Sequence, residues 1–149
     1  MAKTPVKQSR RKASAPVRQL AAFRYELRRF LRFSEKAARG SGITPQQHQL
    51  LLGVAGHTGR GWATISELAE FLQERHNAVV GLVERAARRG LVSKEGIEQD
   101  HRFVRVDLTP QGWQILNGLA ALHRDELGRL QTRTKVALTP TTSGVRQKV

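Results

Sequence analysis

The stretch TISELAEFLQERHNAVVGLVERAARR, residues 64–89, carries the clearest prediction of how this chain folds. Thr64, followed three positions later by Glu67, forms a capping box that starts a helix, because each side chain binds the other residue's backbone amide. Apolar residues then recur at helical spacing, and after a break near Gln73–His76 they recur again from about Asn77 to Arg89. The stretch therefore predicts two short helices joined by a tight turn.

A hairpin is expected directly after the second helix. Gly90 is placed as the residue beyond the helix end, where a left-handed backbone suits glycine. Leu91 and Val92 lead into a polar turn that contains Gly96, and apolar and polar residues alternate over 103–108. Such alternation predicts a two-stranded hairpin. Two short helices with a tight turn, followed by a hairpin, make a winged helix-turn-helix.

Longer helices are predicted on both sides of this unit. Apolar residues at helical spacing predict a helix over 17–38, and Thr109 is placed to cap another over about 110–133. Thr44, Pro45 and Gln47 form a second capping box with proline at the first helical position, which starts a helix that reaches about Ala55. The expected fold is mainly α with a small β-hairpin wing, and the winged helix-turn-helix covers about 44–109.

Positive charge lies on the flanks of the 149-residue chain. The formal net charge is +14 and the isoelectric point about 11.6, which indicates a polyanionic partner. Residues 1–18 carry six basic side chains and no acidic one, whereas residues 60–109 carry eight of each. We expect a flexible basic arm over 1–18, a domain over 19–136 and a flexible tail over 137–149, because the ends lack apolar residues to bury.

Several classes of function find no support in the sequence. The chain has no cysteine, which excludes disulfides and cysteine–zinc sites, and its five histidines are scattered. No nucleophile–base pattern is visible, so we expect no catalytic residue, no metal site, no cofactor and no enzyme activity. No apolar run approaches the roughly 20 residues of a membrane span, and no signal peptide is visible. The expected location is the cytoplasm, with no membrane partner.

Three short motifs carry a resemblance to a known family. They are Gly90-Leu91-Val92-Ser93-Lys94, Asp100-His101-Arg102 and Leu108-Thr109-Pro110-Gln111-Gly112. Together with the helix-turn-helix, at this spacing and over roughly residues 20–130, the chain resembles the MarR family of bacterial transcription regulators.

The resemblance implies a sequence-specific regulator of double-stranded DNA, acting as a homodimer and as a repressor. In that family the first and last helices interleave into a two-fold interface, for which the candidate side chains here are Leu27, Phe30, Leu119 and Leu127. Members often bind a small aromatic or anionic effector between these helices and the winged part. The sequence identifies no such effector; His57 and Trp62 lie in a plausible lining loop, although core packing is the better expectation for Trp62.

The wing of the family carries an arginine that enters the minor groove. Arg102 would be that probe, because a narrow minor groove concentrates negative potential that attracts a guanidinium. Asp100 would hold the long side chain extended. The alternative is a plain surface ion pair at a hairpin turn, typically worth at most about 1 kcal/mol.

The second short helix would read the major groove. Arg75, His76 and Asn77 lie at its start, where side chains reach base edges, although Asn77 could instead only cap the helix. Val80 could touch a thymine methyl, whereas Gly81 has no side chain with which to read a base. Phosphate contacts are expected from further basic residues of the unit: Arg85, Arg88, Arg89 and Lys94.

Two alternatives stay open at this point. Arg85 could pair with Glu84 or Asp107 and never meet a phosphate. The whole chain could also be a general nucleic-acid-binding or architectural protein with weak sequence preference, which the basic arm and Gly81 favour.

Overall fold

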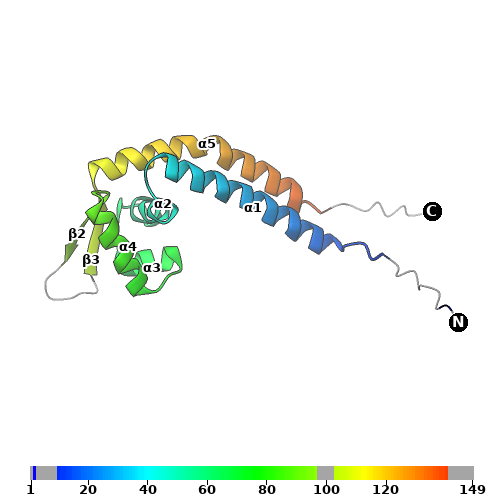
Figure 1. The fold of residues 1–149 in the computed structure, drawn as a ribbon, viewed down its shortest axis with the longest axis horizontal. Coiled ribbons are helices and arrows are strands. Elements are labelled where there is room, and N and C mark those ends of the chain that lie inside the picture. The colour runs from blue at the N-terminus through cyan, green and yellow to red at the C-terminus, as the bar shows by residue number, and fades with distance from the viewer. Residues whose placement is uncertain (1, 3–9, 97–102, 141–149) are drawn as a thin grey trace.

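The computed structural model describes residues 2, 10–96 and 103–140 (Figure 1). In chain order its elements are α1 (Ala15–Gly40), α2 (Pro45–Leu52), η1 (Gly53–His57), β1 (Trp62–Thr64), α3 (Ile65–Leu72), α4 (His76–Arg88), β2 (Val92–Gly96), β3 (Val104–Leu108) and α5 (Pro110–Leu138). The predicted class, mainly α with a small β wing, is confirmed.

Three threonines start helices as the sequence predicted. Thr44 accepts a hydrogen bond from the Gln47 amide at 3.1 Å, and the Gln47 side chain accepts from the Thr44 amide at 3.0 Å. Thr64 and Glu67 make the same reciprocal pair at the start of α3. Thr109 caps α5 by accepting from Gly112 at 3.0 Å. Each cap satisfies amides that the first helical turn leaves without partners.

The turn between α3 and α4 is built on a left-handed residue. Gln73 ends α3 with φ of 51°, a conformation that is uncommon for a residue with a Cβ atom. Gly90 has φ of 70° just beyond α4, which confirms its predicted place. Helix α4 itself begins at His76 and has Arg75 in the N-cap position, so the predicted start at Asn77 was one residue late.

Two predictions about the segment after α2 need correction. The helix was expected to reach Ala55, but regular α structure ends at Leu52 and one π-helical turn, η1, follows over Gly53–His57. The supposed loop beyond it contains β1, which pairs antiparallel with β3 and gives the strand order β1-β3-β2. The hairpin is therefore part of a three-stranded sheet, whose middle strand places Val106 opposite Ala63 and Lys94.

The core lies where the small helices meet the inner face of this sheet. Its members are fully or almost fully buried: Ala38, Ile43, Leu50, Leu51, Val54, Ala63, Ile65, Leu68, Val79, Val83, Ala86, Leu91, Val92, Val106, Leu108, Leu116 and Leu119. They come from every helix and from all three strands. The winged part and the neighbouring turns of α1 and α5 thus share one core.

Helices α1 and α5 pack side by side and extend well beyond the winged part (Figure 1). The start of α1 and the end of α5 lie together at the far end of this two-helix arm. The arm leaves many large apolar side chains exposed: Val17, Leu20, Tyr25 and Leu31 on α1, and Leu122, Leu127, Val136 and Leu138 on α5. Leu119, in contrast, is fully buried within its own chain, so its predicted place in an interface between chains was wrong.

The ends of the two long helices differ from their predicted positions. Helix α1 begins at Ala15, so residues 15–18 are helical and not part of a flexible arm. Helix α5 continues to Leu138, five residues past the predicted end. Among the described residues, no helix combines the length and the apolar character needed to cross a membrane.

Candidate nucleic-acid interface

Helix α4 exposes one face and buries the other. Val79, Val83 and Ala86 point into the core. A helix turns by about 100° per residue, so Asn77, Gly81 and Arg88 lie on the opposite, outward face. This outward face is the surface that a recognition helix would present to a DNA groove.

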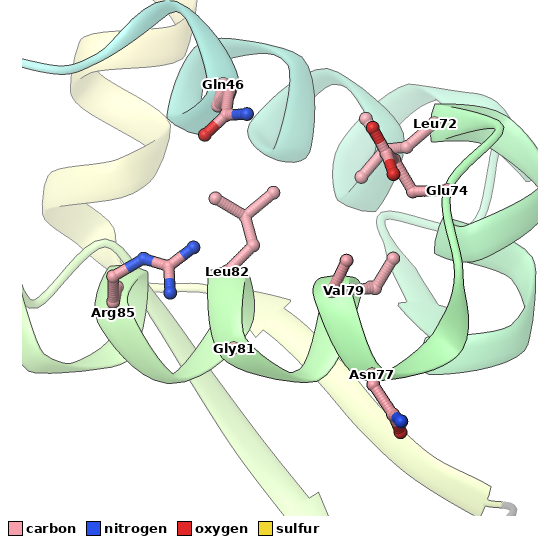
Figure 2. A pocket seen from close by; sticks show the side chains of 9 residues that line it. Gln46, Leu72, Glu74, Asn77, Val79, Gly81, Leu82 and Arg85 are labelled. Atoms are coloured by element: carbon pink, nitrogen blue, oxygen red, sulfur yellow. The ribbon is translucent and has the colours of Figure 1, made fainter.

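The start of α4 presents three polar side chains to solvent. Arg75, His76 and Asn77 are all exposed. Arg75 occupies the N-cap position without a side-chain cap, and Asn77 lies inside the first turn. The alternative that Asn77 only caps the helix is therefore wrong, and its amide is directed away from the helix body (Figure 2).

A hollow of about 280 Å³ lies between α4 and α2. Figure 2 shows Gln46 of α2 above it, with Arg85 at one end and Glu74 at the other. Leu72, Val79 and Leu82 give the hollow an apolar floor. Polar groups with different hydrogen-bonding abilities thus ring an opening beside the outward face of α4.

Ion pairs at the wing decide one of the open alternatives. Glu84 contacts Lys94, with 3.6 Å between Oε1 and Nζ, and Asp107 binds the Arg105 guanidinium through two hydrogen bonds of 2.8 and 2.9 Å. The two carboxylates considered for Arg85 therefore pair with other cations.

The remaining candidate residues of α4 differ in how freely they could contact DNA. Arg88 is exposed, whereas Arg89 donates to the Gly42 carbonyl at 2.7 Å and ties the end of α4 to the turn between α1 and α2. The predicted phosphate role of Arg89 therefore competes with a structural contact. Val80 is half-buried and packs against the core, which limits its reach toward a thymine methyl.

The base of the wing contains a stack that the sequence analysis missed. The Arg60 guanidinium lies 3.9 Å from the centroid of the Trp62 ring, and that of Arg105 lies 4.4 Å from it. Trp62 is half-buried and not part of the core, so the expected core packing was wrong. Cation–π contacts of this kind are worth about 0.5–1 kcal/mol each at exposed sites.

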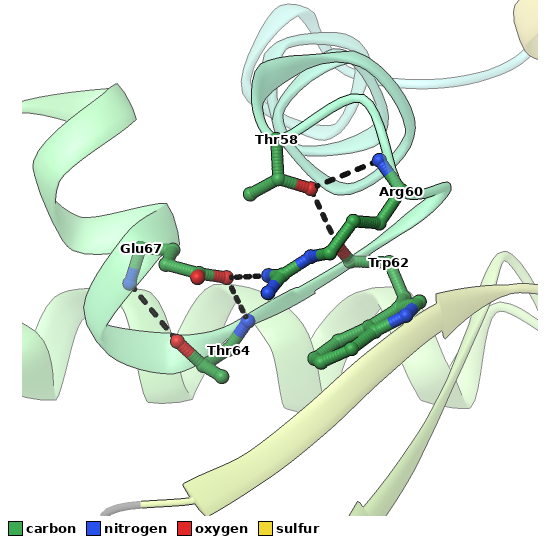
Figure 3. A network of polar contacts seen from close by, with 5 residues as sticks. All are labelled: Thr58, Arg60, Trp62, Thr64 and Glu67. Atoms are coloured by element: carbon green, nitrogen blue, oxygen red, sulfur yellow. Dashed lines mark hydrogen bonds and ion pairs between the residues drawn. The ribbon is translucent and has the colours of Figure 1, made fainter.

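A polar network fixes the loop that carries Arg60 (Figure 3). Thr58 donates to the Trp62 carbonyl at 2.9 Å and accepts from the Arg60 amide at 3.3 Å. Glu67 accepts from both the Thr64 amide and the Arg60 guanidinium. The hydrogen bond from the Thr64 backbone, helped by the positive charge of Arg60, lowers the pKa of Glu67. The tip of the wing, residues 97–102 with Asp100 and Arg102, lies outside the described residues.

The sequence of this unit matches a known family. Residues 41–102, from the turn before α2 to the wing, match the family model of the MarR family. The chain is similar to the MarR family over this segment, and the name MarR-family domain is used below for the matched residues. A search of curated proteins gave no match.

Solved structures share the fold of the MarR-family domain and of the two-helix arm. AbsC, a MarR family transcriptional regulator from Streptomyces coelicolor, is 20% identical with a TM-score of 0.67 over 89% of this chain and 86% of its own. The MarR family transcription regulator SP03579 is 24% identical with a TM-score of 0.63, over 81% and 76%. MepR from Staphylococcus aureus, solved as a complex with DNA, is 20% identical with a TM-score of 0.63, over 76% and 82%.

Two histidines meet where the arm joins the MarR-family domain. The ring centroids of His48 on α2 and His123 on α5 lie 5.1 Å apart. His123 Nδ1 lies 2.7 Å from the Leu119 carbonyl, which only accepts, so this nitrogen donates. His123 Nε2 lies 2.9 Å from Ser34 Oγ on α1. His48 is almost fully buried, and its burial, together with repulsion from His123, lowers its pKa. The spacing of these residues in the sequence gave no sign of this contact.

Proposed function

We propose that the chain is a DNA-binding transcriptional regulator that acts as a homodimer in the cytoplasm, as a repressor and not as an enzyme. The observation that carries the proposal is the outward face of α4, which exposes cationic and amide side chains within a MarR-family domain. A related fold in Staphylococcus aureus MepR has been solved as a complex with DNA.

The proposed contacts divide by their chemistry. Arg75, His76 and Asn77 would reach base edges from the start of α4, because arginine pairs well with guanine and asparagine with adenine. Arg88 and Lys94 would contact phosphates on either side of the groove. At the wing tip, Arg102 would enter the minor groove with Asp100 as its orienting partner.

The two-helix arm supports the proposed homodimer. Its exposed apolar side chains would be unusually numerous for a surface that stays in water. A two-fold dimer would place its two recognition helices about one DNA turn, roughly 34 Å, apart. The operator should therefore be a pseudo-palindrome.

A second candidate function is general nucleic-acid binding with weak sequence preference. The observation in its favour is the charge of residues 1–18, six basic side chains and no acidic one. Contacts of this kind act through phosphates and carry no sequence information.

Selection from a pool of random DNA duplexes distinguishes the two candidates. We expect the full chain to enrich a palindromic motif with half-sites about 10 base pairs apart. Binding of the enriched duplex and of a random duplex is then compared at one salt concentration, because phosphate contacts depend steeply on salt. Enrichment of no common motif would contradict the proposed function and favour the general one.

A further inference from the structure

The outward face of α4 has a gap at its centre. Gly81 lies there, between Asn77 one turn before it and Arg88 two turns after it, on the side opposite the buried Val79 and Val83. A side chain at this point of a recognition helix would face the floor of a DNA groove. Glycine leaves the position empty and lets the helix backbone approach the base edges closely.

The Arg85 side chain lies against this gap. A Cβ atom placed on Gly81 would lie 3.2 Å from Arg85 Nη1, which is the nearest atom outside the helix backbone. Residues four apart are neighbours on a helix surface, so the guanidinium can fold back over the preceding turn. Figure 2 shows it folded along α4 at the end of the hollow, facing toward the Gly81 turn.

Within the described part of the chain, the carboxylates near Arg85 do not hold its guanidinium elsewhere. Glu84, its neighbour in sequence, points to Lys94 on the wing, and Asp107 binds Arg105. Arg85 is exposed, and Glu74 lies at the opposite end of the hollow. The planar fork of Arg85 therefore keeps donors to offer to a ligand that approaches α4 from outside.

We infer that Arg85, lying across Gly81, is the base-reading residue at the centre of α4, and that it selects a guanine in each half-site. The inference rests on the proposed function. Arginine donates two parallel hydrogen bonds to O6 and N7 of guanine in the major groove, which makes it the commonest specific contact. The absent side chain at position 81 thus makes room for a reader from the next turn, and the recognition helix keeps a specific centre.

The test uses the full chain and a duplex enriched by the wild-type protein from a random pool. The guanines of this duplex are replaced one at a time by 7-deazaguanine, which lacks the N7 acceptor. Binding is measured for the wild type and for Arg85→Ala, Arg85→Lys and Gly81→Ala, with Arg88→Ala as the control from the same helix. A random duplex at the same salt concentration reports the contribution of phosphates.

We expect Arg85→Ala to weaken binding to the enriched duplex by roughly 10- to 100-fold and to change binding to the random duplex far less. Replacing one particular guanine of each half-site by 7-deazaguanine should weaken binding by the wild type. The same replacement should not weaken binding by Arg85→Ala any further. Arg85→Lys should weaken this guanine preference, because a compact ammonium lacks the planar fork that matches O6 and N7. Gly81→Ala favours the helix, so the variant should fold; its methyl group should displace the guanidinium and weaken the same guanine preference.

Two results would overturn the inference. One is equal weakening of the enriched and the random duplex by Arg85→Ala, which is the pattern expected of Arg88→Ala and of a phosphate contact. The other is a deazaguanine effect that persists in Arg85→Ala, which would assign the guanine to another residue. If the wild-type protein enriches no common sequence, the proposed function fails and this inference fails with it.

Discussion

Among single residues, Gly112 explains why the motif that begins at Gly90 and the motif that ends at Gly112 occur in the same chain. The start of α5 docks on the turn after α4: the Thr109 amide donates to the Leu91 carbonyl at 3.1 Å, and the Thr109 hydroxyl donates to the Gly90 carbonyl at 2.6 Å. A Cβ atom on Gly112 would lie only 2.1 Å from the Leu91 carbonyl oxygen. Glycine at this position is therefore required by the close approach of a backbone.

Replacing Gly112 with alanine should force the start of α5 away from Leu91. Overpacking of this kind typically costs about 1–3 kcal/mol, and we expect a loss of that size in the free energy of unfolding measured in urea. Gly118→Ala is the matched control, since a Cβ atom there meets nothing within 4 Å. It should instead stabilise the same helix by about 0.5–1 kcal/mol. Equal stability of the two variants would contradict the close approach.

The lowered pKa of His48 predicts how the free energy of unfolding depends on pH. Its folded pKa is lowered from the ordinary value of 6.5, mainly by burial, so the unfolded chain binds a proton more readily than the folded one. The free energy of unfolding should therefore fall as the pH drops below about 6.5 and should not change from this cause above it. Two neighbouring helices supply the polar groups around His48: His123 of α5 faces His48, and Ser34 of α1 binds His123.

The comparison that checks this dependence uses urea unfolding between pH 7.5 and 5. His48→Gln should reduce the loss of stability at low pH, because glutamine does not titrate. His76→Gln, at an exposed position on α4, should leave the pH dependence as in the wild type. A steeper loss in His48→Gln than in the wild type would show that other groups govern the acid side.

At the scale of elements, the stack at the base of the wing joins β1 to its loop and to β3. Two guanidiniums lie over the Trp62 ring, and the nearer is that of Arg60, 3.9 Å from the ring centroid. A double-mutant cycle of Trp62→Leu with Arg60→Met should give a coupling of about 0.5–1 kcal/mol in unfolding free energy. The cycle of Trp62→Leu with Arg88→Met, whose guanidinium lies on another face, should be additive. Additivity in both cycles would mean that the stack contributes no stability.

Helix starts and ends that depend on residues close together in the chain could be predicted from the sequence. The capping boxes at Thr44 and Thr64 and the cap at Thr109 set helix starts through residues three apart, and Gly90 marks a helix end through its own backbone. Strand β1 could not be predicted in this way. Its three residues carry no alternation long enough to detect, and it exists because β3, more than 40 positions later, pairs with it.

The same distinction, between local causes and contacts of distant elements, applies to the candidate site. Spacing along one helix was enough to place Asn77 and Arg88 on exposed turns of α4 and Arg75 in the exposed position just before it. Contacts between distant elements were missed: the Arg60–Trp62–Arg105 stack joins a loop to β3, and the His48–His123 pair joins α2 to α5. From the sequence, Gly81 was only a position without a side chain to read a base. The three-dimensional structure shows the Arg85 guanidinium beside it.

For the molecule as a whole, the two-helix arm is the part that we propose to meet a second copy of the chain. Leu127, which is 52% exposed on α5, is a candidate for the interface. Leu127→Asp would bury a charge without a partner, so we expect the dimer dissociation constant to rise by about 100-fold or more. Light scattering after size-exclusion chromatography gives the mass. Phe103→Asp, at a similarly exposed apolar position next to β3, should remain a dimer; monomerisation of that control alone would place the interface elsewhere.

We expect this molecule to choose its DNA by sequence and not only by charge. The direct measurement is the ratio of two dissociation constants of the full chain, one for its enriched duplex and one for a random duplex of equal length, taken at the same physiological salt concentration. Specific regulators bind their sites at least about 10³-fold more tightly than random DNA, and we predict a ratio of at least that order. A ratio near one would contradict the account, because a net charge of +14 would then be sufficient to explain binding.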